Sequence, residues 1–413
     1  MRIAIIGTGV SGLVAAYLLH EEHELTVYEA EDYVGGHTHT VDVTVQGRTY
    51  AVDTGFIVFN ERTYPNLVTL FRRLGVEWQN SCMGFSVRCE RTGLEYRPTT
   101  LDTLFAQRRN IIRPSFWRML RDIYRFRKES AELLEGEGEM TLGGYLDRRG
   151  YSREFVEHFI VPMGAAIWSA EPVGFRQFPA RRFVRFFTNH GFLEFRGQPQ
   201  WLVVKGGSRR YVERMTAGLG ERIRTSCPVR SVRRSATGVE VTAGEATSEL
   251  YDHVVIATHS DQALALLADP TDAERDILGA IAYQENVTEL HTDTSLLPRR
   301  RKVWAAWNYH IPAGSRDRVA VTYDMNILQS LDAPVEFCVT LNRSESINAE
   351  KKIRSIVYAH PIYTPAAVEA QQRHAEISGV NRTHYCGAYW GNGFHEDGVN
   401  SALAVCRFFG KGL

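Results

Sequence analysis

Apolar and polar residues alternate along this chain in a pattern that predicts strands leading into helices. Residues 2–6 form an apolar run suited to a buried parallel strand, and helix formers follow over residues 13–19. Residues 251–258 form a second such run, which ends in small residues. From Tyr385 onward the pattern is typical of a strand, a glycine-rich loop and a helix through residues 402–405. Together these elements predict a parallel sheet covered by helices.

Three glycines lie where the first strand meets its helix, in the sequence Gly7-Thr8-Gly9-Val10-Ser11-Gly12. Gly7 allows a tight turn, Gly9 lets the backbone approach a pyrophosphate, and Gly12 lets the helix pack close to the strand. The free N–H groups of the helix start would face the phosphates. Glu29 ends the next strand and can accept hydrogen bonds from ribose hydroxyls. Glycine-rich turns have other uses, but the strand, helix and acid at this spacing predict a dinucleotide site.

A second glycine pair, Gly35 and Gly36, follows Glu29 closely and precedes His37. A nicotinamide dehydrogenase does not need this pair, whereas in many flavoproteins such a loop passes along the pyrophosphate of FAD. A plain turn between strands is the alternative. The two glycine loops and Glu29 together favour noncovalent FAD over NAD.

We therefore expect a Rossmann-like FAD-binding domain built from three separated segments, residues 1–60, 200–260 and 375–413. Residues 61–199 and 261–374 would form a mixed substrate-binding domain with a helical part. The expected class is α/β and α+β, and the length of 413 residues leaves room for two cores.

Composition narrows the function further. The formal net charge of +0 removes any general argument for nucleic-acid binding. No secretion signal precedes the first strand, and no apolar run reaches the ~18 residues of a spanning helix, so we expect a cytoplasmic protein. The cysteines contain no C-x-x-C pair, which favours buried reduced thiols over a disulfide framework or zinc ribbon. They are Cys82, Cys89, Cys227, Cys338, Cys386 and Cys406.

Basic residues gather between Gln107 and Lys128, where eight Arg or Lys residues accompany a single acid, Asp122. Aromatic residues lie among them, and most of the stretch is predicted to be a helix after Pro114. One interpretation is a solvated basic helix packed on its own domain. The other is a surface that rests on anionic lipid headgroups, which would place the protein peripherally at the inner face of the membrane.

Phenylalanines are dense from Phe175 to Phe195. Such a region builds either an ordinary core or an apolar pocket. A substrate domain of this kind would favour an apolar small molecule or a lipid over a small polar substrate.

These motifs resemble those of a known group of flavoproteins. The opening glycine motif, Glu29, the Gly35-Gly36 pair, the Lys205-Gly206-Gly207 turn and the C-terminal glycine-rich loop are similar to those of the flavin-containing amine oxidase, phytoene desaturase and protoporphyrinogen oxidase superfamily. The resemblance spans the chain. Residues 53–60, 304–308 and 385–398 also resemble a bacterial branch of FAD-binding oxidoreductases, often found beside cyclopropane-fatty-acid-synthase-like methyltransferases. This branch implies a link to fatty-acyl chains or phospholipids.

The resemblance implies roles for individual residues around FAD. Glu29 would hold the adenosine ribose, Val229 would bracket the adenine, and Gly35, Gly36 and His37 would lie along the phosphates. The pyrophosphate would be held by Gly7, Gly9, Val10, Ser11 and Gly12. The ribityl chain and flavin pyrimidine would be surrounded by Gly393, Phe394, Glu396, Asp397 and Val399.

The start of the last helix would also act on the flavin electrostatically. Its N–H groups and positive dipole end would favour an anionic reduced flavin. The alternative is that Glu396 and Asp397 only cap a helix. Trp390, Asn392 and His395 are candidates for the flavin-facing wall, and no catalytic acid or base is assigned. His395-Glu396 does not begin a zinc motif, because Gly398 and Val399 follow, and no metal is expected.

Two positions depart from the superfamily pattern. His37 stands where arginine often follows the glycine pair, so the phosphates would gain a titrating charge and FAD binding would weaken at high pH. Asn286 stands where many amine oxidases place a lysine near the flavin, which argues against ordinary amine oxidation.

We expect an FAD-dependent oxidoreductase that accepts a hydride from a C–H bond of an apolar substrate, a fatty-acyl chain or phospholipid, as a desaturase does. One alternative is a flavin amine oxidase. A second is a non-catalytic flavoprotein partner of a lipid methyltransferase.

Overall fold

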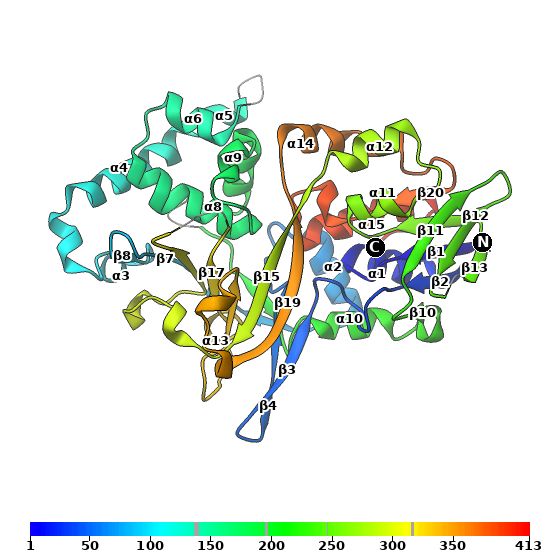
Figure 1. Cartoon of the computed structure of the whole chain (residues 1–413), viewed down its shortest axis with the longest axis horizontal. Coiled ribbons are helices and arrows are strands. Elements are labelled where there is room, and N and C mark those ends of the chain that lie inside the picture. Colours follow the sequence, from blue (N-terminus) through cyan, green and yellow to red (C-terminus); the bar gives the residue numbers. More distant parts are fainter. Residues whose placement is uncertain (136–139, 195–196, 246, 315–317) are drawn as a thin grey trace.

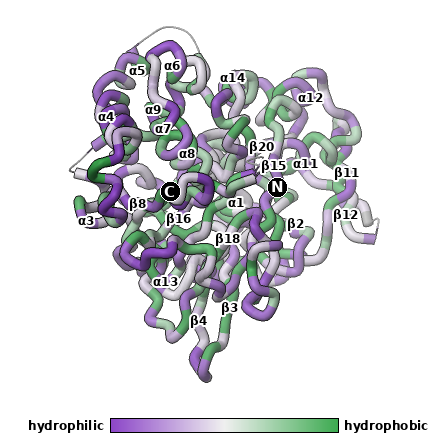
Figure 2. The backbone as a smooth tube through the Cα atoms, turned by 60° about the vertical axis from the view of Figure 1, so that its left-hand side comes forward, coloured by the Kyte–Doolittle hydropathy of each residue, from purple (hydrophilic) through white to green (hydrophobic). Residues whose placement is uncertain are grey.

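A computed structural model describes residues 1–135, 140–194, 197–245, 247–314 and 318–413. Figure 1 shows a parallel sheet with its helices on the right, a helical part on the left, and the long strands β15 and β19 crossing between them. In Figure 2 hydrophilic segments gather on outer helices such as α4 and α5. None of the helices in the described ranges is long and apolar enough to cross a membrane.

A five-stranded parallel sheet contains strands from all three segments predicted to bind FAD. The order is β10 (Ile223–Arg224), β2 (Glu24–Tyr28), β1 (Arg2–Ile6), β14 (His253–Ile256) and β20 (Thr383–Tyr385). Ile5 of β1 lies between Val27 of β2 and Val255 of β14, and all three are fully buried. The buried parallel strands predicted from the apolar runs are therefore confirmed, while the domain boundaries stay a prediction.

One core lies between this sheet and four helices. They are α1 (Val10–Leu19), α2 (Pro65–Leu74), α10 (Arg209–Thr216) and α15 (His395–Phe408). The second core lies on the opposite face of the sheet and contains residues such as Ala4 and Ile256. A β-meander and helices cover it. These elements are β11 (Val229–Arg234), β12 (Val239–Ala243), β13 (Thr247–Tyr251), α11 (Ser260–Leu266), α12 (Asp272–Gly279) and α14 (Pro365–Gln372).

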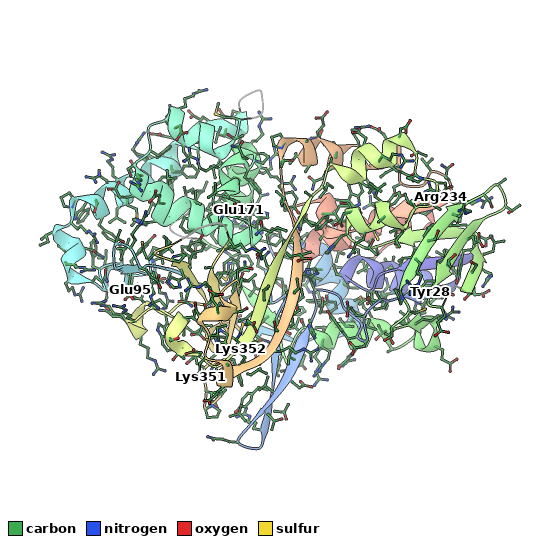
Figure 3. All side chains as sticks on the ribbon, viewed as in Figure 1. Tyr28, Glu95, Glu171, Arg234, Lys351 and Lys352 are labelled. Atoms are coloured by element: carbon green, nitrogen blue, oxygen red, sulfur yellow. The ribbon has the colours of Figure 1, made fainter. Side chains whose placement is uncertain are left out.

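A buried ion pair fastens α12 to β11. Arg234, labelled in Figure 3, places Nη1 2.8 Å from Oε1 of Glu274, and the two side chains are 5% and 3% exposed. The Tyr385 hydroxyl donates to the same carboxylate at 2.6 Å. The pair therefore ties the meander side of the sheet to the last strand, β20.

A seven-stranded sheet forms the floor of the second part. Its order is β19 (Lys352–Pro361), β15 (Tyr283–His291), β18 (Cys338–Leu341), β17 (Val321–Asp324), β16 (Trp307–Ile311), β7 (Phe85–Cys89) and β8 (Leu94–Tyr96). The hairpin β3 (Thr40–Val45) and β4 (Arg48–Asp53) projects below it in Figure 1. The short helix α13 (Met325–Leu328) follows β17.

The apolar run at 201–204 forms a strand, β9 (Leu202–Val204), but not in the parallel sheet. It pairs with β5 (Val58–Phe59) and β6 (Trp78–Asn80) in a separate three-stranded sheet. One partner lies before the predicted domain boundary at residue 60 and the other after it, and the apolar pattern alone does not specify this pairing.

The helical part contains most of the dense aromatic region. Its longer helices are α4 (Pro114–Glu129), α6 (Leu142–Arg148), α8 (Val161–Trp168) and α9 (Ala180–Asn189). The helix predicted after Pro114 is confirmed. Shorter pieces are α3 (Leu101–Leu104), η1 (Arg108–Ile112), α5 (Glu132–Glu135), α7 (Arg153–Phe155), the π-helical turn η2 (Val156–Ile160) and η3 (Gly174–Gln177).

The remaining short 3-10 helices lie in loops. They are η4 (Gly220–Arg222), η5 (Thr294–Leu296), η6 (Arg301–Val303), η7 (Ser344–Ser346), η8 (Ala349–Lys351), η9 (His374–Glu376) and η10 (Ala388–Trp390).

Aromatic stacking explains why phenylalanines crowd the middle of the chain. Phe183 is fully buried, and its ring centroid lies 4.0 Å from that of Phe187 and 6.1 Å from that of Trp168. Most of this region is therefore core. Phe195, the end of the predicted region, lies outside the described residues.

The six cysteines are unpaired, as expected. Four are buried and Cys227 is half-buried, but Cys82 is exposed. The expectation of uniformly buried thiols is therefore wrong for Cys82.

Candidate active site

A cavity of about 880 Å³ extends from the carboxyl ends of the parallel strands to the long strands β15 and β19. Open parallel sheets bind ligands at this edge. Most of the predicted cofactor residues line it, namely Gly7, Gly9, Val10, Ser11, Glu29, Gly35, Gly36, His37, Val229, Gly393 and Phe394. Of the three candidates for the flavin-facing wall, Asn392 and His395 also line it.

The first glycine turn has the geometry that its sequence predicts. Gly7 has a φ of +98°, which side chains other than hydrogen rarely allow. A Cβ on Gly12 would lie 2.0 Å from the Gly7 carbonyl oxygen, so glycine is required for helix α1 to pack against the turn. A Cβ on Gly9 would meet no heavy atom within 4 Å. The turn is therefore closed behind Gly12 and open at Gly9, toward the cavity.

Helix α1 presents its amino end to this space without a capping side chain. Gly9 is the N-cap residue, and free N–H groups at such a position bind phosphate. The residues present thus fit the pyrophosphate of a dinucleotide.

The Glu29 carboxylate is fixed by a residue that sequence reasoning missed. The backbone N–H of Thr8 donates to Oε2 at 3.0 Å, and the Thr8 hydroxyl donates to the same oxygen. The other oxygen accepts from the Glu31 N–H at 3.0 Å. Thr8 occupies a variable position of the glycine motif, so only its proximity to Glu29 in the fold shows this positioning.

The second glycine loop lies directly on the first. A Cβ on Gly36 would lie 3.1 Å from the Cα of Gly9, and Gly36 itself has a φ of +57°. The Gly35 N–H donates to the Thr8 hydroxyl at 3.2 Å. Because the two loops meet at Gly9, one phosphate group could contact the backbone of both.

His37 does not supply the titrating charge expected from the sequence. Its ring lies 4.9 Å from Tyr358 and 5.7 Å from both His259 and His360, between centroids. Burial among these rings, and then the neighbouring His259, lower the pKa of His37 to about 4. This pKa argues against a charge on His37 that changes in the physiological range, while the effect of His37 on FAD binding stays a prediction.

The C-terminal loop reaches the cavity through Asn392, Gly393, Phe394 and His395. The His395 ring stacks 3.5 Å from Phe56, and its Nε2 lies 2.8 Å from the Tyr211 hydroxyl. Burial lowers the pKa of His395 well below the ordinary value. These contacts make His395 a residue that joins the loop to α10.

Trp390 does not belong to this wall. The 3-10 turn η10 directs its ring to His374, with centroids 4.4 Å apart, whereas the adjacent Tyr389 lines the cavity. Tyr389 therefore takes the place in the cavity lining that was expected of Trp390, because the sequence contains no sign of this turn.

The side chains of Glu396 and Asp397 cap helices. Glu396 accepts from the N–H groups of Asn66 and Leu67, at 3.1 and 2.9 Å, at the start of α2. Asp397 accepts from the Phe394 N–H at 2.9 Å, at the start of its own helix. Burial raises the pKa of Asp397 to about 6. Both carboxylates therefore cap helices, as in the alternative interpretation. The contact of Glu396 and Asp397 with flavin stays a prediction, and it would involve their backbone groups only.

Gly12 and Val399 also lie outside the cavity lining. Gly12 supports the turn from behind, and Val399 is fully buried in the core beside α1. Both shape the site without facing it.

Asn286 stands at the position where many amine oxidases place a lysine. Its side chain is part of a buried amide network. Its Nδ2 donates to the Ser169 carbonyl at 3.1 Å and to Nδ1 of His360 at 3.0 Å. Its Oδ1 accepts from Asn342 at 2.7 Å. No lysine or arginine is among the described residues that line the cavity.

A buried carboxylate joins two of the sequence motifs. Asp53 accepts from the Ser208 N–H at 2.9 Å and from its hydroxyl at 2.8 Å, and Thr40 and Gln329 also donate to it. The end of β4 is thereby attached to the start of α10. Within the described ranges no group of three or more His, Cys, Asp or Glu side chains is arranged to hold a metal ion.

Residues 10–295, well over half of the chain, match the family model described as flavin containing amine oxidoreductase. The chain belongs to this family. Its membership confirms the predicted superfamily, FAD as the cofactor and the oxidoreductase class.

A curated relative of this chain comes from Mycobacterium tuberculosis (strain H37Rv) and is named as the flavin-containing monoamine oxidase AofH. It is 25% identical over 285 residues, which cover 65% of this chain and 59% of the relative. The chain thus matches less than two thirds of that protein's length.

Two solved structures have the same overall fold. A protein named as a protoporphyrinogen oxidase from Exiguobacterium sp. 255-15 gives a TM-score of 0.70 at 18% identity, and a fatty acid isomerase from P. acnes gives 0.69 at 17%. Each comparison covers 99% of this chain and 98% of the other. The likeness confirms the predicted fold class.

In this member of the family, the cavity lining includes a group of aliphatic and aromatic side chains. They are Met83, Ile167, Phe186, Trp307, Leu328 and Leu341, among others, and Ser169, Thr288 and His360 line the same cavity. Met83 precedes β7 in sequence and Leu341 ends β18, so the apolar lining comes largely from the second part of the chain.

Proposed function

We propose that this chain is an FAD-dependent oxidoreductase whose substrate is apolar, with a fatty-acyl chain or phospholipid as the favoured class. The observation that carries the proposal is one continuous cavity. It joins two glycine loops that fit a pyrophosphate to a wall of aliphatic and aromatic side chains. A wall of aliphatic and aromatic side chains is typical of sites that take apolar ligands.

Bound FAD would accept a hydride equivalent from a C–H bond, and with loss of a proton from the adjacent carbon the acyl chain would gain a double bond. The chain's own residues bind, orient and exclude water. Asn286 holds His360 with Nδ1 as an acceptor, which fixes the ring's neutral tautomer at the cavity wall. Burial keeps the pKa of His360 at about 3, so the imidazole adds no positive charge beside an apolar substrate.

Amine oxidation is the second candidate, favoured by the match to the relative named as a monoamine oxidase. The two candidates differ in the charge of the substrate. A carboxylate introduced into the apolar wall would disfavour an acyl chain, whereas it would attract a protonated amine.

The test mixes the purified yellow protein anaerobically with phosphatidylglycerol, with a free fatty acid or with a monoamine, and follows flavin absorbance and products. The proposal expects bleaching by a lipid and a product two mass units lighter. Met83→Glu, in the cavity wall, should raise the KM for lipid about tenfold. Met140→Glu is the matched control, because Met140 is also a partly buried methionine and does not line the cavity.

Bleaching by the amine alone, with release of ammonia or an aldehyde, would assign amine oxidation instead. A flavin that no substrate bleaches would favour the third possibility, a non-catalytic partner of a lipid methyltransferase. Co-purification with such a methyltransferase would then be the relevant measurement.

A further inference from the structure

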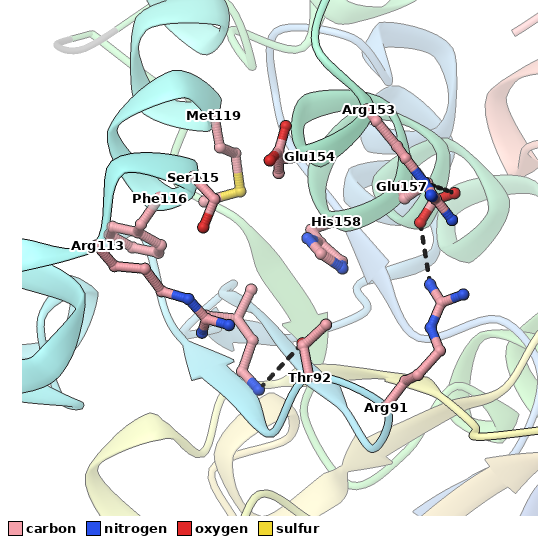
Figure 4. A pocket seen from close by; sticks show the side chains of 11 residues that line it. Arg91, Thr92, Arg113, Ser115, Phe116, Met119, Arg153, Glu154, Glu157 and His158 are labelled. Atoms are coloured by element: carbon pink, nitrogen blue, oxygen red, sulfur yellow. Dashed lines mark hydrogen bonds and ion pairs between the residues drawn. The ribbon is translucent and has the colours of Figure 1, made fainter.

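A second pocket of about 360 Å³ lies in the helical part and shares no lining residue with the cofactor cavity. It is bounded by the first turn of α4, the turn between β7 and β8, and the segment from α7 to η2 (Figure 4). In Figure 4 the Arg113, Ser115 and His158 side chains lie around the same hollow. None of these residues has a part in the proposed reaction.

The acids of this pocket are already paired with arginines. Glu157 lies 3.0 Å from Arg91 and 2.8 Å from Arg153, between charged nitrogen and oxygen atoms. Glu154 pairs with Arg118. The acidic side chains therefore leave no negative charge that would repel an anion.

Several donor groups at the pocket have no partner. The Arg113 guanidinium forms no ion pair or hydrogen bond within the described part of the chain. Helix α4, which is 16 residues long, begins without a capping side chain. Pro114 has no N–H, and the Phe116 and Trp117 N–H groups bond to the Arg113 carbonyl, so the Ser115 N–H is the backbone donor left at this helix start. His158 is 8% exposed, and its Nε2 is buried without a hydrogen-bond partner. Burial would raise the pKa of the Cys89 thiol, but hydrogen bonds with His158 and Thr92 lower it to about 6, so this sulfur is one partner of the ring and Nε2 is the nitrogen without a partner. An unpaired cation, one free N–H at the helix start and an unsatisfied ring nitrogen together fit an oxyanion.

The surface beside this pocket is apolar. Ile111, Ile112 and Trp117 are 48%, 84% and 50% exposed, and the Trp117 indole N–H donates to the Ile111 carbonyl at 2.7 Å. This segment is at the left-hand end of the molecule in Figure 1, away from the parallel sheet. Exposed aliphatic residues beside tryptophan and arginine suit the interface of a bilayer.

We propose that the pocket holds the phosphate of an anionic phospholipid while Ile111, Ile112 and Trp117 enter the headgroup region of the membrane. Arg113 joins the two features, because it lines the pocket and directly follows Ile112 in the chain. The phosphate would complete the bonding of Arg113 and His158, and the apolar residues would leave water. This docking does not depend on which reaction occurs in the cofactor cavity.

Total charge is a poor guide to this surface. Arg108 pairs with Asp102, and Arg121 and Arg125 pair with Asp122, which is fully buried. Reversal of Arg121 or Arg125 would remove one of the two cations paired with Asp122 and place a new acid beside this buried carboxylate, which would destabilise α4, so neither tests membrane contact. Arg113 is the better probe, because its removal breaks no internal pair.

The experiment is sedimentation of the FAD-loaded protein with phosphatidylglycerol or phosphatidylcholine vesicles. We expect salt-sensitive binding to phosphatidylglycerol, weakened about fivefold in Arg113→Gln and in His158→Leu, and about tenfold in Trp117→Ser. Arg214→Gln is the matched control, because Arg214 is an exposed arginine on α10. Unfolding midpoints and flavin absorbance establish that each variant is folded.

Three results would overturn the proposal. The first is no binding to vesicles, or equal binding by all variants. The second is loss of binding in Trp117→Ser with full binding in Arg113→Gln and His158→Leu, which would leave an apolar contact without a phosphate site. The third is an increase in the unfolding midpoint with inorganic phosphate that requires Arg113 but no vesicle binding, which would assign the pocket to a soluble phosphate compound.

Discussion

At the scale of single residues, two glycines of one motif have opposite structural settings. Gly9 has ordinary backbone angles, with φ −62° and ψ 175°, and the space beside its Cα is empty. Gly12 faces the Gly7 carbonyl, and an added methyl group would lie 2.0 Å from it. Gly9 is therefore required by the ligand, whereas Gly12 is required by the fold.

Gly9→Ala should change the free energy of unfolding of the apoprotein by less than about 1 kcal/mol, because alanine at this helix start meets no protein atom. FAD occupancy should fall at least tenfold, since the methyl group would stand in the path of the phosphates. Absorbance of purified protein gives the occupancy, and thermal unfolding gives the stability. Wild-type occupancy in Gly9→Ala would place the phosphate loop elsewhere.

Gly12→Ala is the matched comparison. It should destabilise the apoprotein by about 3 kcal/mol, because the helix must move away from the turn. A stability equal to that of Gly9→Ala would contradict the close packing of α1.

The neutral His37 leads to a prediction about pH. With a pKa of about 4, His37 carries no charge above about pH 6, so FAD retention should stay constant from about pH 6 to pH 9. Fluorescence of released FAD would follow this. A stepwise release centred near pH 6.5 would instead show that His37 is charged when FAD is bound.

The same residue should make the protein less stable in acid. The pKa of His37 is lower in the folded chain than in the unfolded chain, so the unfolded state binds the proton first as pH falls. Stability is thus complete above about pH 6.5 and is lost progressively toward pH 4. His37→Gln should reduce this loss, which urea unfolding at several pH values would measure.

At the scale of elements, the start of α15 connects the C-terminal loop to α2. The Glu396 carboxylate accepts two backbone N–H groups of α2, whose own N-cap, Tyr64, provides no side-chain bond. Glu396→Ala should lower the free energy of unfolding by about 2 kcal/mol and leave the flavin spectrum unchanged. A shifted flavin spectrum without a change in stability would instead support a contact between Glu396 and the flavin.

The elements that sequence predicted well are those whose signals are local. The β1 turn, the helix after Pro114 and the strand at 253–256 each carry an apolar period or a glycine with a specific backbone need. The apolar residues of β9 favour a strand, but its partners at 58–59 and 78–80 depend on contacts distant in sequence. The charge of the basic stretch at 107–128 is judged in sequence from its own composition, whereas Asp102 and Glu154 outside it neutralise Arg108 and Arg118.

At the scale of the whole molecule, the cavity depends on how the two parts of the chain are joined. The glycine loops could be predicted because each residue acts through its own backbone. The cluster of His37, His259 and His360 could not be predicted. Its three residues are each separated by more than a hundred residues in the chain, and only the fold brings them together. The direction of the Trp390 ring likewise depends on packing against α14 and η9 rather than on its motif.

Arg182 is one residue that joins the parts. From α9 its Nε donates to Asn392 Oδ1 at 3.0 Å, and the guanidinium also donates to the Gly391 carbonyl and to Gln371. Its guanidinium carbon lies 4.5 Å from the centre of the Tyr363 ring. The helical part therefore holds the C-terminal loop that lines the cofactor cavity.

Arg182→Met keeps much of the side-chain volume but removes these donors. We expect the free energy of unfolding to fall by about 2 kcal/mol and FAD to dissociate about tenfold faster, because the buried loop carbonyl loses a charged partner. Arg181→Met is the matched control, since Arg181 on the same helix donates to the Leu133 carbonyl at 3.2 Å, remote from the loop. FAD release after dilution, followed by flavin fluorescence, separates the two variants. Equal release rates would mean that the parallel sheet and its own helices hold the loop in place, and that the helical part contributes only substrate contacts.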